Sequence, residues 1–176
     1  LSRINATVSQ VLDFSKARPV ALRRCTVAEV VEAARRLTAT YVRKSDVVLE
    51  VDLAEDLPPL TADPDQLEQV FVNLILNACR AMPDGGRLTV SARAVDDAVR
   101  IEVADTGTGI APERLGQIFD PFYSAFGSGT GLGLSLCRRI VQAHGGGIDV
   151  ASEPGEGTTF RIDLPLEPPH APLAGH

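Results

Sequence analysis

Two asparagines and an arginine recur one helical turn apart inside the most apolar stretch of the sequence. Asn73, Asn77 and Arg80 are spaced by four and three residues, so on a helix they fall within roughly 60° of one another, on a stripe beside the apolar face. A buried amide without a hydrogen bond costs on the order of 1–3 kcal/mol, so this stripe needs partners. A single asparagine would most simply cap a neighbouring loop. Two amides followed by a cation instead favour a ligand that carries oxygens, together with a hard metal ion.

The stripe lies on a helix predicted over residues 63–82. Asp63 followed by Pro64 is typical of an N-cap with proline in the first turn, and the Pro-Asp-Gly-Gly sequence at 83–86 is typical of a helix stop and a turn. Apolar residues recur at helical spacing between these ends: Leu67, Val70, Phe71, Leu74, Ile75 and Ala78. The helix is therefore expected to be mostly buried.

Two glycine-rich stretches could bring backbone close to a ligand. In the Asp-Thr-Gly-Thr-Gly sequence that begins at Asp105, the glycines permit close approach, and the aspartate can accept a hydrogen bond from an amino group. Residues 127–134 lead directly into a helix predicted over 134–144, where free amides and the helix dipole favour an anion. This second stretch is neither a P-loop, because no Gly-Lys-Ser/Thr ends it, nor a dinucleotide fingerprint, because no strand immediately precedes it.

Composition limits the classes of protein that fit. At 176 residues and 44% hydrophobic content, the chain can form one globular domain. Its net charge of −6 argues against a nucleic-acid partner, so phosphate binding would rely on backbone amides and a few cations. No apolar run reaches about 18 residues, so no membrane contact is expected. Three separated cysteines predict buried, reduced thiols in a cytosolic setting: Cys25, Cys79 and Cys137.

For the first third of the chain, the sequence predicts two helices and three strands. Residues 1–17 form a predicted helix with a seam of apolar residues, for which pairing with another chain and packing on the domain both stay open. A strand at 22–25 precedes a helix over 27–42 that begins with a capping box of Thr26 and Glu29, and strands follow at 47–53 and 60–61. The buried face of that helix is predicted to comprise Val30, Val31, Ala34, Leu37 and Tyr41.

The remainder predicts two hairpins and two further helices. Strands at 87–94 and 99–105 form one hairpin, and strands at 148–152 and 158–164 form the other. A short helix over 112–118 leads to three aromatics within five residues, an anchor in a chain with only 5% aromatic residues. His144 is expected to end the helix that follows the second glycine stretch, and the tail from Pro165 is expected to be disordered.

Four motifs, in this order and spacing, resemble the nucleotide-binding motifs of sensor histidine kinases. They are Asn73-xxx-Asn77-xx-Arg80, Asp105-x-Gly107-x-Gly109, Phe119-xx-Phe122 and Gly129-Thr-Gly-Leu-Gly-Leu134. The match extends to His144-Gly-Gly and Gly157-Thr158-Thr159-Phe160, and so covers roughly residues 22–165. Each motif alone is modest, whereas the ordered set is highly specific.

The resemblance implies an α/β (α+β) sandwich of the Bergerat ATP-binding type, as in gyrase, Hsp90 and MutL. Its sheet is mixed and mainly antiparallel, with three helices on one face. Residues 1–21 would be the end of the second helix of a dimerisation and phosphoacceptor domain with its linker, residues 22–166 the catalytic ATP-binding domain, and residues 167–176 a disordered tail.

The resemblance also implies roles for individual residues in binding ATP or ADP with Mg²⁺. Asn77 matches the Mg²⁺ ligand, Asn73 its neighbour in the catalytic stripe, and Arg80 a cation that meets phosphate. Asp105 matches the acceptor for the adenine amino group. The other nucleotide-binding positions would be Gly107, Gly109, Ile110, Phe119, Phe122, Gly129, Thr130, Gly131, Leu132, Gly133 and Thr158.

The implied function is transfer of the γ-phosphoryl group of Mg-ATP to a histidine upstream of Leu1, for relay to the receiver-domain aspartate of a response regulator. The intact protein would be a homodimer through its own dimerisation domain, cytoplasmic in this part and with a membrane anchor elsewhere left open. Two alternatives remain, a docking module without kinase activity and an ATP hydrolase of the same superfamily. Residues 124–128 contain no lysine, although related lids often do, which predicts weaker ATP binding. The histidines are His144, His170 and His176, and none lies in a helix-borne acceptor motif.

Overall fold

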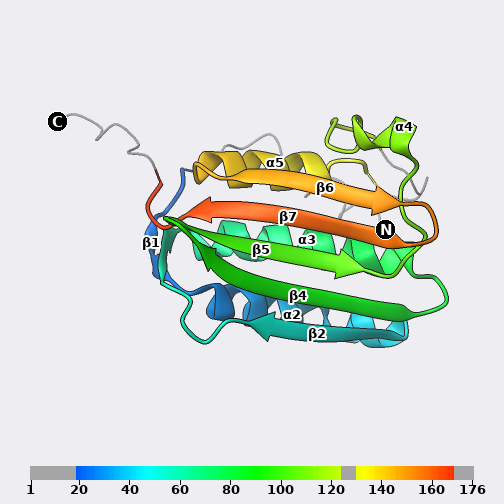
Figure 1. The fold of residues 1–176 in the computed structure, drawn as a ribbon, viewed down its shortest axis with the longest axis horizontal. Coiled ribbons are helices and arrows are strands. Elements are labelled where there is room, and N and C mark those ends of the chain that lie inside the picture. Colours follow the sequence, from blue (N-terminus) through cyan, green and yellow to red (C-terminus); the bar gives the residue numbers. More distant parts are fainter. Residues whose placement is uncertain (1–18, 124–129, 169–176) are drawn as a thin grey trace, which may run out of the picture.

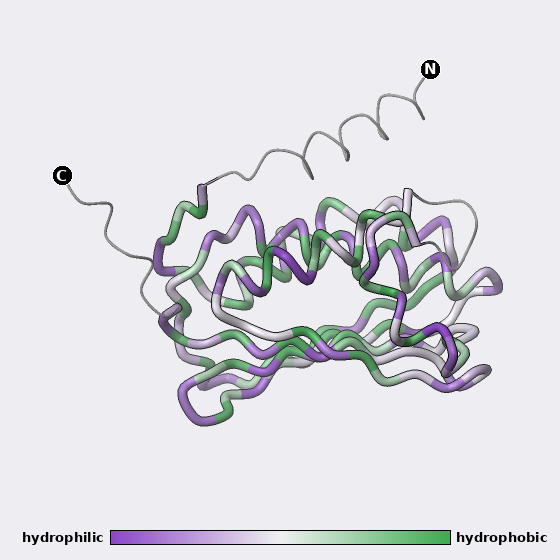
Figure 2. Tube along the Cα trace, turned by 90° about the horizontal axis from the view of Figure 1, so that it is seen from above, coloured by the Kyte–Doolittle hydropathy of each residue, from purple (hydrophilic) through white to green (hydrophobic). Residues whose placement is uncertain are grey.

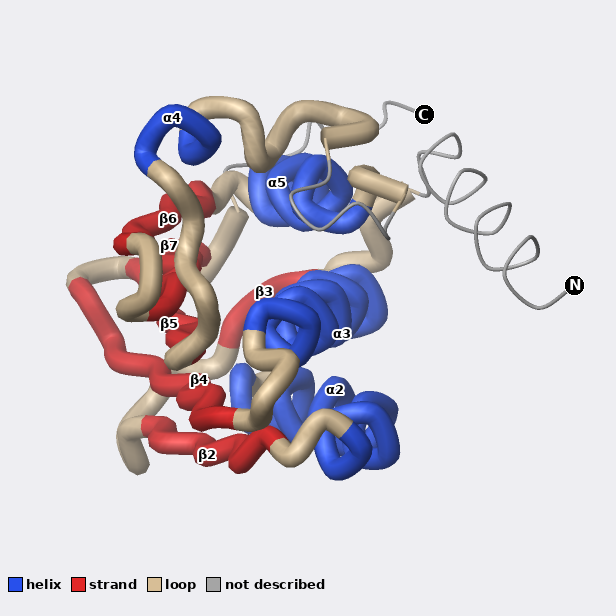
Figure 3. The backbone as a smooth tube through the Cα atoms, turned by 90° about the vertical axis from the view of Figure 1, so that its right-hand side faces the viewer, coloured by secondary structure: helices blue, strands red, loops and turns tan. Residues whose placement is uncertain are grey.

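The structure is a computed structural model that describes residues 19–123 and 130–168. These residues form two layers, a sheet on one side and helices on the other (Figures 1 and 3). The predicted helix over 1–17 and the tail beyond residue 168 lie outside the described residues. In chain order the elements are β1 (Arg23–Cys25), α2 (Val27–Lys44), β2 (Val47–Leu53), β3 (Leu60–Ala62), α3 (Pro64–Ala81), β4 (Gly86–Val95), β5 (Ala98–Asp105), α4 (Pro112–Leu115), α5 (Gly133–Ala143), β6 (Gly147–Glu153) and β7 (Gly157–Pro165).

The larger sheet has five strands in the order β2-β4-β5-β7-β6. β2 runs parallel to β4, and every other neighbouring pair is antiparallel, so the sheet is mixed and mainly antiparallel as predicted. Helices α2, α3 and α5 cover one face of it, which confirms the expected fold class (Figure 3). A small antiparallel pair, β1 with β3, lies at one end and is joined to the main body by a 2.9 Å bond from the Thr61 N–H to the Leu166 carbonyl.

Helix α3 is the middle helix of the helical layer, between α2 and α5, and it packs on the sheet (Figure 3). The Asp63 carboxylate accepts bonds from the backbone N–H groups of Asp65 and Gln66, which confirms the predicted N-cap. The apolar positions predicted to face inward are at most 4% exposed: Leu67, Val70, Phe71, Leu74, Ile75 and Ala78. In Figure 2 the sheet lies edge-on below this helical layer.

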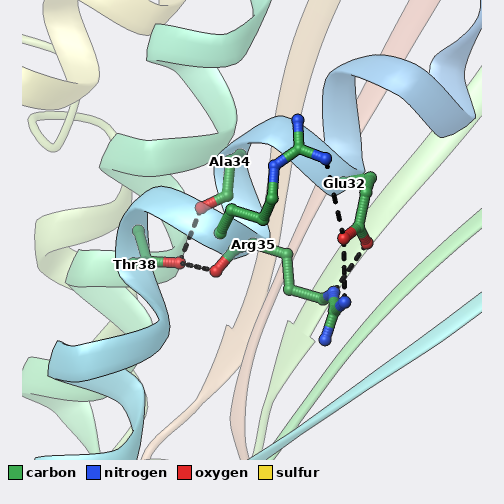
Figure 4. Close-up of polar contacts among 5 residues, drawn as sticks. Glu32, Ala34, Arg35 and Thr38 are labelled. Carbon is green, nitrogen blue, oxygen red and sulfur yellow. Dashed lines mark hydrogen bonds and ion pairs between the residues drawn. The ribbon is translucent and has the colours of Figure 1, made fainter.

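The predicted buried face of α2 is wrong at two positions. Leu37 is 66% exposed and Tyr41 is 42% exposed, whereas Thr38 and Val42 are buried. The prediction chose the apolar side chains, but the Thr38 hydroxyl donates to the Ala34 carbonyl one turn earlier at 2.8 Å, so this threonine enters the core without an unsatisfied group (Figure 4).

The end of α4 and the start of the tail also differ from the prediction. Helix α4 ends at Leu115 rather than residue 118, and turns follow it. The chain remains bonded to the fold through Leu166, whose N–H donates to the Asp97 carbonyl at 3.0 Å, so the tail begins later than Pro165. Within the described ranges, no helix combines the length and apolar character needed to cross a bilayer.

Candidate functional site

The amide stripe of α3 faces the start of α5. A Cβ atom added to Gly133, the first residue of α5, would lie 3.5 Å from Oδ1 of Asn73. Asn73 and Asn77 are half-buried, and Arg80 is exposed. The structure therefore brings the first amide of the stripe against the helix N-terminus that follows the second glycine stretch, as a shared ligand would require.

Asn77 and Arg80 contact each other directly. Arg80 donates from Nη1 to Oδ1 of Asn77 at 3.0 Å. An amide oxygen has two lone pairs, so this bond leaves acceptor capacity on Asn77. Among the described residues there is no group of three or more His, Cys, Asp or Glu side chains that could hold a metal ion. A metal in this site would therefore depend on amide oxygen and on oxygens of the ligand, a set that suits Mg²⁺.

Asp105 ends β5 and is only 8% exposed. Burial raises the pKa of its carboxyl group, while hydrogen bonds from the backbone N–H groups of Gly107 and Thr158 lower it in part. The bond from Gly107 reaches Oδ1 at 2.9 Å, and Thr158 stands opposite Asp105 in the β5–β7 register. The carboxylate is thus held in place by two neighbouring segments.

Gly107 cannot carry a side chain without disturbing this arrangement. An added Cβ would lie 2.6 Å from the Ala81 carbonyl oxygen and 2.8 Å from Oδ1 of Asp105. The next residue donates its N–H to the same Ala81 carbonyl at 2.9 Å. The end of α3 and the turn after β5 are therefore in close backbone contact, which explains the glycine.

Gly109 and Ile110 are attached to the β6–β7 hairpin. Gly109 has a φ of +69°, and an added Cβ would lie 2.0 Å from the Glu153 carbonyl oxygen. The Ile110 N–H donates to Oγ of Ser152 at 2.8 Å, and Ser152 donates to the Gly157 carbonyl at 2.7 Å. Ser152 was not among the predicted site residues, because a lone serine in an alternating strand carries no recognisable signal.

The two phenylalanines of the third motif lie in different environments. Phe119 packs edge-to-face on Phe160, with centroids 6.3 Å apart, and the Arg138 guanidinium lies 5.7 Å from its ring. Phe122 is 72% exposed and has a φ of +67°. Phe119 is therefore a core anchor, which agrees with the aromatic anchor predicted for this segment.

The base of the second glycine stretch is packed against the Phe122 backbone. A Cβ added to Gly131, where φ is +68°, would lie 2.3 Å from the Phe122 carbonyl carbon. Leu132 is buried and its carbonyl accepts from the Leu136 N–H at 3.0 Å, while Thr130 is half-buried. The predicted site residue Gly129 and the lid segment 124–128 lie outside the described residues.

The three cysteines are free and buried, as predicted. Burial raises the pKa of all three thiols, and that of Cys137 reaches about 12. The Cys137 thiol donates to the Val70 carbonyl at 3.7 Å, which joins α5 to α3. These thiols stay protonated at neutral pH and serve as packing groups rather than nucleophiles.

Comparison with known proteins agrees with this geometry. The family model of histidine kinase-, DNA gyrase B- and HSP90-like ATPases matches residues 62–168. The chain is 37% identical over 164 residues to the sensor histidine kinase ZraS of Escherichia coli (strain K12), which is 93% of this chain and 35% of that protein. It spans 23–39% of the length of the first three curated relatives that it matches.

Solved structures give the same result. The crystal structure of full-length ShkA in complex with AMPPNP matches with a TM-score of 0.85 and 29% identity, over 97% of this chain and 37% of that one. The histidine kinase ThkA in complex with the response regulator protein TrrA matches with a TM-score of 0.80 and 27% identity, over 95% of this chain and 48% of that one. The chain therefore belongs to the family of histidine kinase-, DNA gyrase B- and HSP90-like ATPases, and within it to the ATP-binding catalytic domains of histidine kinases.

Proposed function

We propose that this chain binds Mg-ATP between α3, α5 and the end of β5, and that the protein to which it belongs transfers the γ-phosphoryl group to a histidine on a separate acceptor helix. The observation that carries the proposal is the position of Asn73 beside Gly133, where an added Cβ would lie 3.5 Å from the Asn73 Oδ1, because it places an amide stripe next to a helix N-terminus that can receive phosphate. Residues 1–21 would connect the two domains.

The adenine end of the site is assigned to Asp105. Its carboxylate is oriented by the Gly107 N–H, and an ionised carboxylate can accept a bond from the adenine amino group. Gly107 and Gly109 leave room where a side chain would collide, and Ile110, Phe119 and Phe122 would provide apolar surface. Burial of Asp105 strengthens such a bond because little water competes for it.

The phosphate end is assigned to α3 and to the residues that precede α5. Asn77 would hold Mg²⁺ through its amide oxygen, with Arg80 and the backbone amides of residues 129–133 directed at phosphate. When bound at Asn77, Mg²⁺ would supply positive charge to the phosphate oxygens. The contribution of this chain is position and electrostatics rather than a covalent step.

Asn73 distinguishes a kinase from a hydrolase of the same fold. Hydrolases that resemble this chain place a glutamate at this position to activate water, and an amide cannot take the proton. We therefore expect negligible steady-state ATP hydrolysis by the chain alone. Rapid hydrolysis that is abolished by Asn77→Ala would overturn the kinase assignment.

The acceptor histidine is expected outside this domain. His144 is 2% exposed, with both ring nitrogens in hydrogen bonds, so it is not held for attack. His170 and His176 lie outside the described residues. A response regulator as the final partner is supported by the ThkA complex with TrrA, in which a relative of this chain is bound to such a protein.

Nucleotide binding and phosphoryl transfer can be tested separately. Calorimetry with ADP and Mg²⁺ should show binding that Asp105→Ala abolishes and that Asp149→Ala, a change at an exposed position of β6, leaves intact. No binding at millimolar nucleotide would leave the docking-module alternative. With γ-labelled ATP, the chain should not label itself but should label an added acceptor-helix fragment, and acid-labile label on the chain alone that His144→Ala removes would contradict the proposal.

A further inference from the structure

The side chain of His144 joins the end of α5 to the start of α3. Its Nε2 atom accepts a 3.0 Å bond from the Asp63 N–H, and its Nδ1 lies 2.8 Å from the Ile140 carbonyl oxygen. A backbone N–H can only donate and a carbonyl can only accept, so Nδ1 carries the proton. This neutral form of the imidazole satisfies one backbone group on each of the two helices.

The bond between Asp63 and His144 links residues that are far apart in the sequence, at the capped start of α3. Asp63 is 6% exposed, and its carboxylate holds the N–H groups of Asp65, Gln66 and Ala21. Its own N–H donates to the Nε2 atom of His144. Without an acceptor at His144, this buried donor would lose its hydrogen bond and be left unsatisfied.

Two further contacts show that the same pairing continues along the helices. Val70, seven residues after Asp63, accepts from Cys137, seven residues before His144. Asn73, ten residues after Asp63, faces Gly133, eleven residues before His144. At 1.5 Å per residue these separations are about 15 and 16.5 Å, so α3 and α5 run antiparallel in one consistent register from His144 to the glycine stretch.

This register needs a directional contact to define it. Apart from the bonds that His144 and Cys137 make, α5 contributes buried apolar side chains such as Leu136, Ile140 and Val141, and apolar contact is largely non-directional. A shift of one residue would move the helices by about 1.5 Å and break a 3.0 Å hydrogen bond, whereas apolar side chains can repack.

We propose that His144 is a positioning residue for the phosphate end of the nucleotide site. Through Asp63 it fixes α3 in register with α5, and so it holds Asn73 and Asn77 opposite the residues that precede α5. This inference rests on the proposed nucleotide site. At the adenine end, Asp105 of β5 stands opposite Thr158 of β7, so these two residues are paired through the sheet rather than through the α3–α5 interface.

The test compares two ligands that share adenine but differ in phosphate. Affinities for adenosine and for ADP with Mg²⁺ are measured in the wild type and two variants of the whole chain. His144→Leu has a similar volume but no acceptor, and it should weaken Mg-ADP on the order of tenfold while changing adenosine less than about twofold. His144→Gln places an amide oxygen near the Nε2 position, and it should keep the Mg-ADP affinity within about threefold of wild type.

The outcomes distinguish a failure of this inference from a failure of the proposed nucleotide site on which it rests. If the wild type binds neither ligand, the proposed function fails. If it binds both, and His144→Leu either leaves Mg-ADP unchanged or weakens the two ligands equally, the positioning role is wrong. Should His144→Leu prove unfolded by circular dichroism, His144→Asn replaces it, because its shorter amide cannot reach the Asp63 N–H and the same selective loss is expected.

Discussion

Arg80 donates a 3.0 Å hydrogen bond to the amide oxygen of Asn77, so the proposed phosphate cation is bonded to the proposed metal ligand. The two residues are one turn apart on α3, and the guanidinium is exposed. The bond orients the Asn77 carboxamide and leaves its second lone pair available. Metal and phosphate binding should therefore be coupled through this pair.

Replacing Arg80 should affect binding far more than folding. Arg80→Ala removes an exposed side chain, so we expect the free energy of unfolding in urea to change by about 0.5 kcal/mol or less. The affinity for Mg-ADP should fall several-fold, because both the cation and the bond that orients Asn77 are lost. Arg80→Lys should recover part of it, since it keeps the charge but not the planar fork. Equal affinities for all three proteins would exclude Arg80 from the site.

Substitutions of two glycines, Gly131 and Gly116, test the close packing of the second glycine stretch against the Phe122 backbone. Gly131→Ala would place a methyl group 2.3 Å from the Phe122 carbonyl carbon at a φ of +68°, so it should lower the free energy of unfolding by at least about 1 kcal/mol and weaken Mg-ADP binding. Gly116→Ala is the matched control, because Gly116 has a helical φ of −67° and no atom within 4 Å of the added methyl. It should be neutral or slightly stabilising. Similar stabilities for the two variants in urea would contradict this close contact.

Substitutions of Asp63 should separate its two roles, which are to cap α3 and to bond the segment before β1 through the Ala21 N–H. Asp63→Asn keeps an Oδ1 acceptor for the N–H groups of Asp65 and Gln66, but its NH₂ group cannot accept the 2.9 Å bond from the Ala21 N–H. Hydrogen exchange at Ala21 should therefore rise while α3 stays protected. Asp63→Ala loses both functions and should cost about 1–2 kcal/mol of stability. Unchanged exchange at Ala21 in Asp63→Asn would show that other contacts hold this segment.

The sequence predicts local structure well where a single segment contains its own signals. The N-cap at Asp63 and the apolar period of α3 lie within one helix, and both are confirmed. The order of the motifs led to the family resemblance, and the fold that the resemblance implied is confirmed. The face of α2 was wrong because the cost of burying Thr38 depends on a bond to Ala34 that apolar patterning ignores.

Contacts between distant segments could not be predicted in this way. The bond from Asp63 to His144 joins residues 81 positions apart, and the bond from Ile110 to Ser152 joins residues 42 apart. Neither the spacing nor the periodicity of the sequence around His144 and Ser152 indicates such a partner. The sequence indicated that His144 ends α5, which is confirmed, but the other half of its role depends on the antiparallel packing of two helices.

Asp105 provides a test of pH dependence in which burial and hydrogen bonding act in opposite directions. Burial raises the pKa of its carboxyl group above the ordinary value, in spite of bonds from the Gly107 and Thr158 N–H groups. The folded chain then holds this proton more tightly than the unfolded chain. The stabilisation that protonation brings is fully present below the unfolded-state pKa, about 3.9, and is lost as the pH rises through the higher folded-state pKa.

The stability of wild type relative to Asp105→Asn should therefore increase as the pH is lowered from neutrality through this window. Urea unfolding of both proteins across the acidic range measures the difference, and the asparagine variant keeps an acceptor for the Gly107 N–H while removing the titration. The opposite slope would mean that the two backbone bonds outweigh burial. Acidification should weaken nucleotide binding, because a protonated Asp105 no longer offers an ionised acceptor. Since the pKa of Asp105 is raised, the wild-type affinity for ADP should fall at a higher pH than an ordinary aspartate would give. Asp105→Asn should lack this pH-dependent step.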